Sequence, residues 1–140
     1  LSPEHLAPFG ASLGPGIVLA LPEEACGVAE TARVTRWLSQ ETAGQCGPCL
    51  HGLNAIATAI EELAAGRAAA GTEQRIDRWA SMAQGRGACA HPDGAVRFVS
   101  SALNVFAEDF TDHARHGPCA ACTGPFELPL PAPARLRTAV

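Results

Sequence analysis

The sequence predicts an all-α fold, a small antiparallel four-helix bundle, and three observations support this prediction. The chain has 140 residues, of which 47% are hydrophobic, so it can form one compact domain with a core. Apolar residues recur at helical spacing in several segments, and short connections that contain glycine separate these segments. Helices joined by short connections pack as antiparallel neighbours.

Four segments have helical character. The first runs from 22 to about 41, with a proline and two acids in its first turn. The second covers 48–66, and the third covers 72–85 with Thr72 as its N-cap. The fourth follows Pro92 and extends to about 116, and its apolar face is the clearest of the four: Val96, Val99, Leu103, Phe106 and Phe110.

We expect three regions along the chain. Residues 1–21 have the composition of an extended linker or the end of a preceding domain, with a short extended segment at 17–21. Residues 22–116 form the helical domain, and the proline-rich residues 117–140 form a tail. Because the chain begins at Leu1 without a methionine, we expect it to be a piece of a longer protein.

Charge and hydropathy exclude several partners. The net charge is −4 with no run of like charges, which argues against binding to nucleic acid or to an acidic membrane surface. No apolar run approaches the ~20 residues that span a bilayer, so we expect no membrane insertion and a soluble, cytoplasmic location. The sequence contains no phosphate-binding loop and no dinucleotide fingerprint.

Three of the six cysteines lie in two connections between helices. Cys46 and Cys49 belong to a Cys-Gly-Pro-Cys motif between the first two predicted helices, and Cys89 precedes the fourth. In an antiparallel bundle these two connections lie at the same end, so the three thiols should converge there. The helices that begin beside them favour thiolates, because the amino-terminal end of a helix carries a partial positive charge.

Cys-Gly-Pro-Cys is also the redox motif of thioredoxin. That motif follows a strand within an alternating α/β pattern, whereas the segments on both sides here are helical. Gln45 also replaces the tryptophan usual before the first cysteine. We therefore favour metal binding over a thioredoxin-like oxidoreductase.

Three stretches together resemble a known family. ETAGQCGPCLHG, then CAHPDGAV, then a helix ending NVFAEDF are similar to the C-terminal iron-sulfur domain of the NADH-binding flavoprotein subunit of respiratory NADH:quinone oxidoreductase (complex I). The family pattern, E-S-C-G-x-C-x-P-C-R-x-G with a distant cysteine, also occurs in related NAD-linked hydrogenases and formate dehydrogenases. The resemblance runs from about Gly14 to His113. It implies a helical bundle that holds a [4Fe-4S] cluster.

The resemblance assigns three ligands and leaves the fourth open. Cys46, Cys49 and Cys89 match three of the four family cysteines, whereas the first family cysteine falls on Ala43, which cannot bind iron. His91 is the candidate fourth ligand by its chemistry, although its usual family role is to support the ligands. The alternatives are a three-cysteine cluster with an open or exogenous site, and a domain that kept the fold without the cluster.

The resemblance also implies a function and partners. It predicts an electron-transfer module that accepts electrons from reduced flavin and passes them to an iron-sulfur or ferredoxin-like acceptor subunit. FMN and NAD would bind only to an upstream domain of the same chain, and the protein could lie at the periphery of the membrane through a complex. Whether the parent protein is an enzyme of this class depends on that upstream part.

The remaining cysteines should lie at the other end of the bundle. Cys26 precedes Ala43 by 17 residues along one helix, or roughly 25 Å, and Cys119 and Cys122 follow the fourth helix. With His113 or His116 they make a recognised zinc ligand set. The alternative, which we favour from the sequence, is a buried free Cys26 and an exposed thiol pair.

Overall fold

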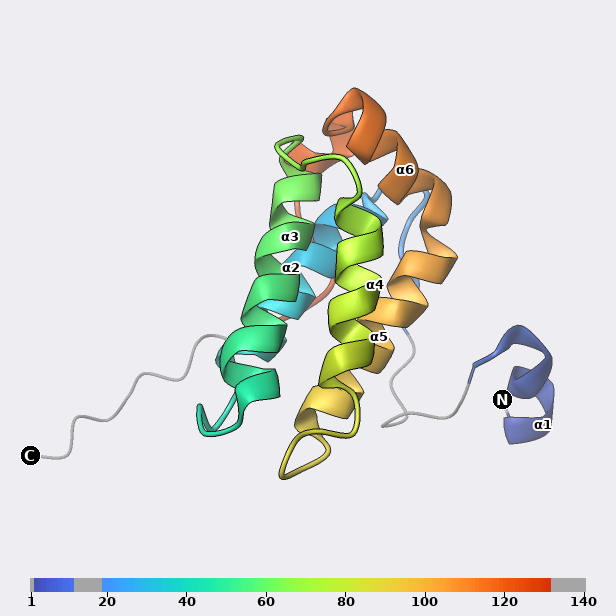
Figure 1. Ribbon diagram of the computed structural model, residues 1–140. Helices are drawn as coiled ribbons and strands as arrows, with labels where there is room; N and C mark the ends of the chain where they lie inside the picture. The colour runs from blue at the N-terminus through green and yellow to red at the C-terminus, as the bar shows by residue number, and fades with distance from the viewer. Residues whose placement is uncertain (1, 12–18, 132–140) are drawn as a thin grey trace, which may run out of the picture.

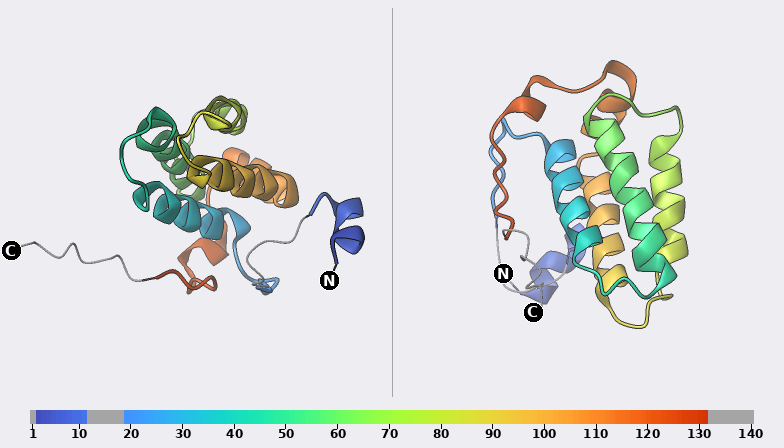
Figure 2. Two further views of the ribbon diagram at one scale, coloured as in Figure 1. Left: turned by 90° about the horizontal axis from the view of Figure 1, so that it is seen from below. Right: turned by 90° about the vertical axis from the view of Figure 1, so that its left-hand side faces the viewer.

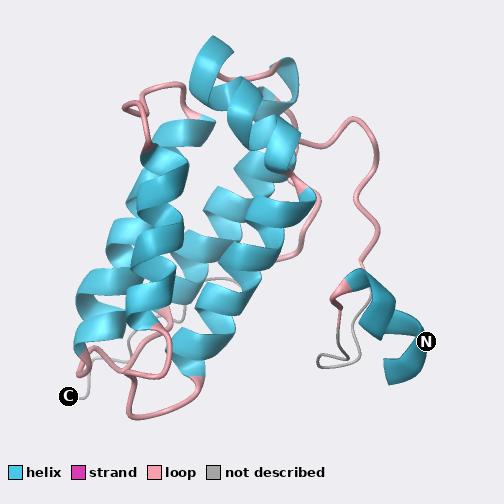
Figure 3. Cartoon of the chain, turned by 45° about the vertical axis from the view of Figure 1, so that its right-hand side comes forward, coloured by secondary structure: helices cyan, strands magenta, loops and turns pink. Residues whose placement is uncertain are grey.

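A computed structural model describes residues 2–11 and 19–131, and helices are the only regular secondary structure within these ranges (Figure 1, Figure 3). The all-α prediction is therefore confirmed. The predicted extended segment 17–21 lies partly outside the described residues. The elements in chain order are α1 (Pro3–Leu6), η1 (Ala7–Phe9), α2 (Gly27–Gln40), η2 (Pro48–Leu53), α3 (Asn54–Ala64), α4 (Thr72–Ala83), α5 (His91–Val105), α6 (Ala107–His116) and η3 (Ala120–Thr123).

Helices α2 to α5 lie side by side and form the body of the domain (Figure 1, Figure 2). Helix α2 packs on α3, α3 on α4, α4 on α5, and α5 on α2. The connections 41–47 and 84–90 lie together at one end of these helices, which we call the glycine-turn end (Figure 1). The connection 65–71 and helix α6 lie at the opposite end (Figure 1).

The first helix begins later than predicted. Residues 22–26 precede α2, and the Ala25 N–H donates to the Pro22 carbonyl in a turn at 3.0 Å. Cys26 is the N-cap, with extended backbone and a sulfur that accepts from the Ala29 N–H at 3.3 Å. The prediction of a start at Pro22 was wrong because the thiol of Cys26 takes the capping role that the acids and the proline suggested.

The second and third helices agree with prediction in position and differ in detail. The segment from Pro48 opens as a π-helix, η2, which leads directly into α3. Helix α4 begins at Thr72, but its N-cap is Gly71, whose φ of 77° is in the left-handed region that favours glycine. Thr72 instead donates its hydroxyl to the Ala69 carbonyl at 2.6 Å.

The predicted fourth helix is two helices. The helix is interrupted at Phe106, where φ is −105° and ψ is 30°. The expectation of one helix over 92–116 was therefore wrong. The Phe106 ring lies directly over Gly27: a Cβ on that glycine would be 2.4 Å from the ring. The break redirects α6 across the end of the bundle and buries Phe110 and His113 (Figure 2).

The core is built from the apolar faces that the sequence predicts. Phe110 of α6 is buried among residues from all four long helices, and Leu103 and Phe106 pack partly buried against them. Among the described residues, no helix is long and apolar enough to cross a membrane. The large, fully buried apolar side chains are Phe110, Leu53, Ile56, Ile60, Leu63, Ile76, Val28 and Val99.

Candidate metal centres

The Cys-Gly-Pro-Cys motif lies at the glycine-turn end, where η2 begins. The Cys46 carbonyl accepts from the N–H groups of Cys49 at 3.1 Å and Leu50 at 2.9 Å, so the motif is itself the first turn of the helical segment. Pro48 is tolerated there because the first turn of a helix does not use its N–H groups. Cys49 is buried and Cys46 is half-buried.

Cys89 lies in the second connection at this end, two residues before α5. Its thiol is exposed. Burial raises the pKa of Cys49, and the Cys89 and Cys46 thiolates raise that pKa further by charge repulsion. The connections that carry the three cysteines lie together at this end (Figure 1). The structure therefore brings the three predicted ligands to one end of the domain.

The structure shows where the two residues considered for the fourth ligand position lie. Ala43 is exposed on the connection 41–47. His91 donates from Nε2 to the Leu38 carbonyl at 2.9 Å, which joins the start of α5 to the end of α2. The space beside Gly87 is filled by Pro92, so this glycine permits close packing within the protein.

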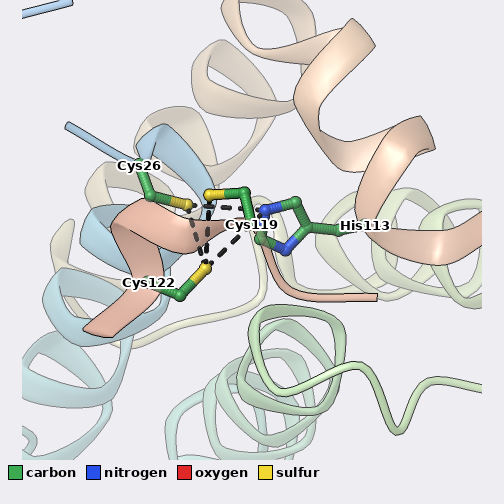
Figure 4. Close-up of side chains that lie close together, drawn as sticks. All are labelled: Cys26, His113, Cys119 and Cys122. Carbon is green, nitrogen blue, oxygen red and sulfur yellow. Dashed lines mark hydrogen bonds between the residues drawn. The ribbon is translucent and has the colours of Figure 1, made fainter. Parts of the chain in front are cut away.

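A second group of metal-binding side chains lies at the opposite end. Cys26, His113, Cys119 and Cys122 place their ligand atoms within 4.8 Å of one another (Figure 4). The Cys122 sulfur is 3.4 Å from that of Cys26 and 3.6 Å from that of Cys119. His113 Nε2 is 3.6 Å from the Cys26 sulfur and 3.8 Å from the Cys122 sulfur.

Three separate segments supply this group. Cys26 caps α2, His113 is in the last turn of α6, and Cys119 and Cys122 belong to the turn of η3, where the Cys122 N–H donates to the Cys119 carbonyl at 3.2 Å. His113 is 4% exposed, and its Nδ1 has no hydrogen-bond partner. The sulfurs are therefore the polar neighbours of its ring.

The thiols of this group differ in acidity. Burial opposes ionisation of Cys119, but hydrogen bonds with His113, Cys122 and Cys26 outweigh it and lower the pKa of Cys119 to about 7. Burial and hydrogen bonds with Cys26 and Cys119 raise the pKa of Cys122 to about 12. Burial also raises the pKa of Cys26. The group therefore stabilises one thiolate, at Cys119, before the others.

Sequence reasoning placed these cysteines at one end but did not identify which histidine joins them. His113 points into the group, whereas His116 is exposed and lies 3.7 Å from Asp112. The pattern His113-x5-Cys119-x2-Cys122 was visible in the sequence. The break at Phe106, which turns α6 so that His113 reaches Cys26, was not.

Fold and sulfur chemistry together define a small helical domain of the metal-binding class. Residues 29–113 match the family described as NADH-ubiquinone oxidoreductase-F iron-sulfur binding region. The match covers more than half of the chain, and the chain belongs to this family.

Longer relatives carry the same region. The chain is 26% identical over 110 residues to the NADH-quinone oxidoreductase F subunit of Streptomyces coelicolor, covering 79% of this chain and 24% of that protein. It is 29% identical over 119 residues to the corresponding F subunit of Mycobacterium bovis, with 83% and 26% covered. For the F subunit of Escherichia coli the identity is 27% over 108 residues, with 76% and 24% covered. The chain thus spans about a quarter of the length of the relatives it matches.

Proposed function

We propose that the glycine-turn end holds an iron-sulfur cluster through the thiolates of Cys46, Cys49 and Cys89 and that the domain transfers single electrons. The observation that carries the proposal is the position of these three cysteines in the sequence. All three lie inside the family-matched region 29–113, whereas Cys26, Cys119 and Cys122 lie outside it. An iron-sulfur binding region that uses its own cysteines therefore has these three.

The donor set fits a cluster at three positions. Thiolates are the usual protein ligands of iron-sulfur clusters. η2 begins beside Cys46 and Cys49, and α5 begins two residues after Cys89, so two helix starts stabilise negative charge on the sulfurs. By the family resemblance, the fourth ligand position falls on Ala43, whose methyl group cannot bind iron, so this corner is left to an exogenous ligand or to a three-iron form.

The chain itself contributes position and surroundings. When bound, the cluster supplies a one-electron carrier. Cys49 gives it one buried anchor, and Cys89 leaves one side open towards solvent, where an electron partner can approach. The His91–Leu38 hydrogen bond fixes α5 against α2 and so limits variation in the distance between the two cysteine-bearing connections.

The wider role follows from the relatives. They are named as one subunit of NADH-quinone oxidoreductase, so we propose that this domain works beside other subunits. In this proposal reduced flavin, held with NAD by an upstream domain, donates electrons, and an iron-sulfur or ferredoxin-like subunit accepts them. The assembly would lie on the cytoplasmic side, at the periphery of a membrane complex.

Anaerobic reconstitution with iron and sulfide tests the cluster. We expect the protein to become brown, to bind iron and sulfide, and to bleach with dithionite, and we expect Cys49→Ser to lose this absorbance. Ala43→Cys should restore four thiolates and make the cluster more resistant to chelators and oxygen. Ala114→Cys, at an exposed position of α6, is the matched control and should not make the cluster more resistant. Binding of neither iron nor sulfide by the parent protein would reject the proposal.

The second candidate function is a structural or interaction domain without a cluster. The observation that favours it is Ala43 at the first ligand position. This function predicts a colourless protein whose free energy of unfolding is the same with and without iron.

A further inference from the structure

From the geometry we infer a structural zinc site at the opposite end of the domain, in which Cys26, His113, Cys119 and Cys122 bind one Zn²⁺ ion. This site is separate from the cluster proposed above and shares none of its ligands. It lies at the junction of α2, α6 and η3 (Figure 4).

The distances match a single tetrahedral ion. With Zn–S bonds of about 2.3 Å and Zn–N bonds of about 2.0–2.1 Å, neighbouring sulfurs lie about 3.8 Å apart, and sulfur and nitrogen about 3.6 Å apart. The observed sulfur pairs are at 3.4 Å and 3.6 Å, and the observed sulfur–nitrogen pairs are at 3.6 Å and 3.8 Å. In an iron-sulfur cluster each thiolate binds a different iron, so its sulfurs lie farther apart than these do.

The types and number of the ligands favour zinc in a structural role. Three cysteines and one histidine make a closed four-coordinate set, and Cys-x2-Cys is a common spacing for two zinc ligands. Cys26 and His113 are buried, Cys122 is half-buried and Cys119 is exposed. Four protein ligands fill a tetrahedral shell, so no coordination position is left for a substrate. The Ala29 N–H donates to the Cys26 sulfur, which caps the amino-terminal end of α2. Three thiolates and one Zn²⁺ carry a net charge of −1, and the partial positive charge of this helix end offsets part of that charge.

The same side chains are poorly satisfied without an ion. His113 is buried, its Nδ1 has no partner, and the neighbours of its Nε2 are sulfurs. Sulfur is a weak hydrogen-bond partner, so these contacts offset little of the cost of burying an imidazole. A bond from Nε2 to zinc would replace them with a strong interaction.

The site joins the C-terminal segment to the bundle. Pro118 packs against Gly66, where a Cβ would be 2.5 Å from the Pro118 ring. Beyond Cys122, Arg33 lies 4.5 Å from the centre of the Phe126 ring and donates to the Leu128 carbonyl. Residues 117–131 therefore run along α2, and two of the four proposed ligands, Cys119 and Cys122, belong to this segment (Figure 2). The regular structure of this segment is one short turn, η3, which gives it few hydrogen bonds of its own. A zinc ion bound to Cys119 and Cys122 would therefore fix its path.

Metal analysis tests the site directly. The reduced protein, without reconstitution of iron, is loaded with Zn²⁺, desalted and measured for zinc and iron per chain. We expect one zinc per chain, and substitution by Co²⁺ should give the strong absorbance of tetrahedral cobalt thiolates. Cys119→Ser and His113→Gln should lose both. His116→Gln and Cys46→Ser, the matched histidine and cysteine controls, should keep both.

A conservative variant separates ligand loss from misfolding. His113→Cys keeps four donors, so it should bind one zinc and shift the cobalt spectrum towards that of a four-thiolate site. Chelation of zinc should also speed chymotrypsin cleavage at Phe126, by about tenfold or more, because the segment would then open locally.

Four results would overturn the inference. They are no zinc above background, zinc retained by Cys119→Ser and His113→Gln, equal loss in Cys46→Ser, and a disulfide among Cys26, Cys119 and Cys122 that persists after treatment with a reductant. Because these assays use protein without a cluster, they do not depend on the iron-sulfur proposal.

Discussion

A methyl group added at Gly27 should destabilise the domain by crowding the break between α5 and α6. The ideal Cβ would lie 2.4, 2.6 and 2.7 Å from three atoms of the Phe106 ring. Ordinary carbon contacts are about 3.5–4.0 Å, so the ring must move by about 1 Å. Overpacking of this kind costs about 1–3 kcal/mol, and alanine returns up to about 1 kcal/mol of helix propensity. We therefore expect Gly27→Ala to lower the free energy of unfolding by up to about 3 kcal/mol.

The test is a double-mutant cycle with Phe106→Ala, measured by urea unfolding under identical reducing conditions. Without the ring, only the helix propensity remains, so Gly27→Ala should become neutral or stabilising by up to about 1 kcal/mol. The sign of the effect should thus depend on the background. If Gly27→Ala costs the same free energy in both backgrounds, the contact does not determine the position of α6.

Three further changes have expected outcomes. Phe110→Ala should lower the free energy of unfolding by about 3–5 kcal/mol, and a loss below about 1 kcal/mol would contradict its burial. The two hydrogen bonds from Arg36 lower the pKa of Glu61 from its ordinary 4.5, although burial opposes this shift. The pair therefore stabilises the fold fully above pH 4.5, and this contribution fades as the pH falls through the lowered pKa. Glu61→Gln should cost about 1 kcal/mol or less at pH 7 and less at pH 3, since the pair is partly exposed, and equal losses would refute the linkage. His91→Ala should cost about 0.5–1.5 kcal/mol through the lost bond to Leu38 and leave the bound iron unchanged, whereas loss of iron would assign it as a ligand.

Much of the fold was predictable because it depends on local patterns. The apolar spacing in 92–116 correctly placed Val96, Val99 and Phe110 in the core. The same spacing continues through Phe106, so periodicity could not reveal the break there. At the break, the Phe106 ring lies over Gly27, a residue far away in the sequence, and local periodicity carries no information about such a contact.

The two ends of the domain show the same division. Short connections between antiparallel helices predicted that Cys46, Cys49 and Cys89 would lie at the same end, and the connections 41–47 and 84–90 do lie together there. The resemblance to the family places the fourth ligand position on Ala43, which has no donor atom in any conformation. Their role as cluster ligands stays a prediction.

By itself, the sequence determined the all-α class, the iron-sulfur family and the separation of the cysteines into two groups. The tertiary structure decided that Cys26, His113, Cys119 and Cys122 lie within 4.8 Å of one another. The physical reason is that metal-ligand geometry requires positions accurate to a fraction of an ångström. Here those positions depend on the turn of α6 at Phe106 and on the path of the C-terminal segment along α2, both set by contacts between distant residues.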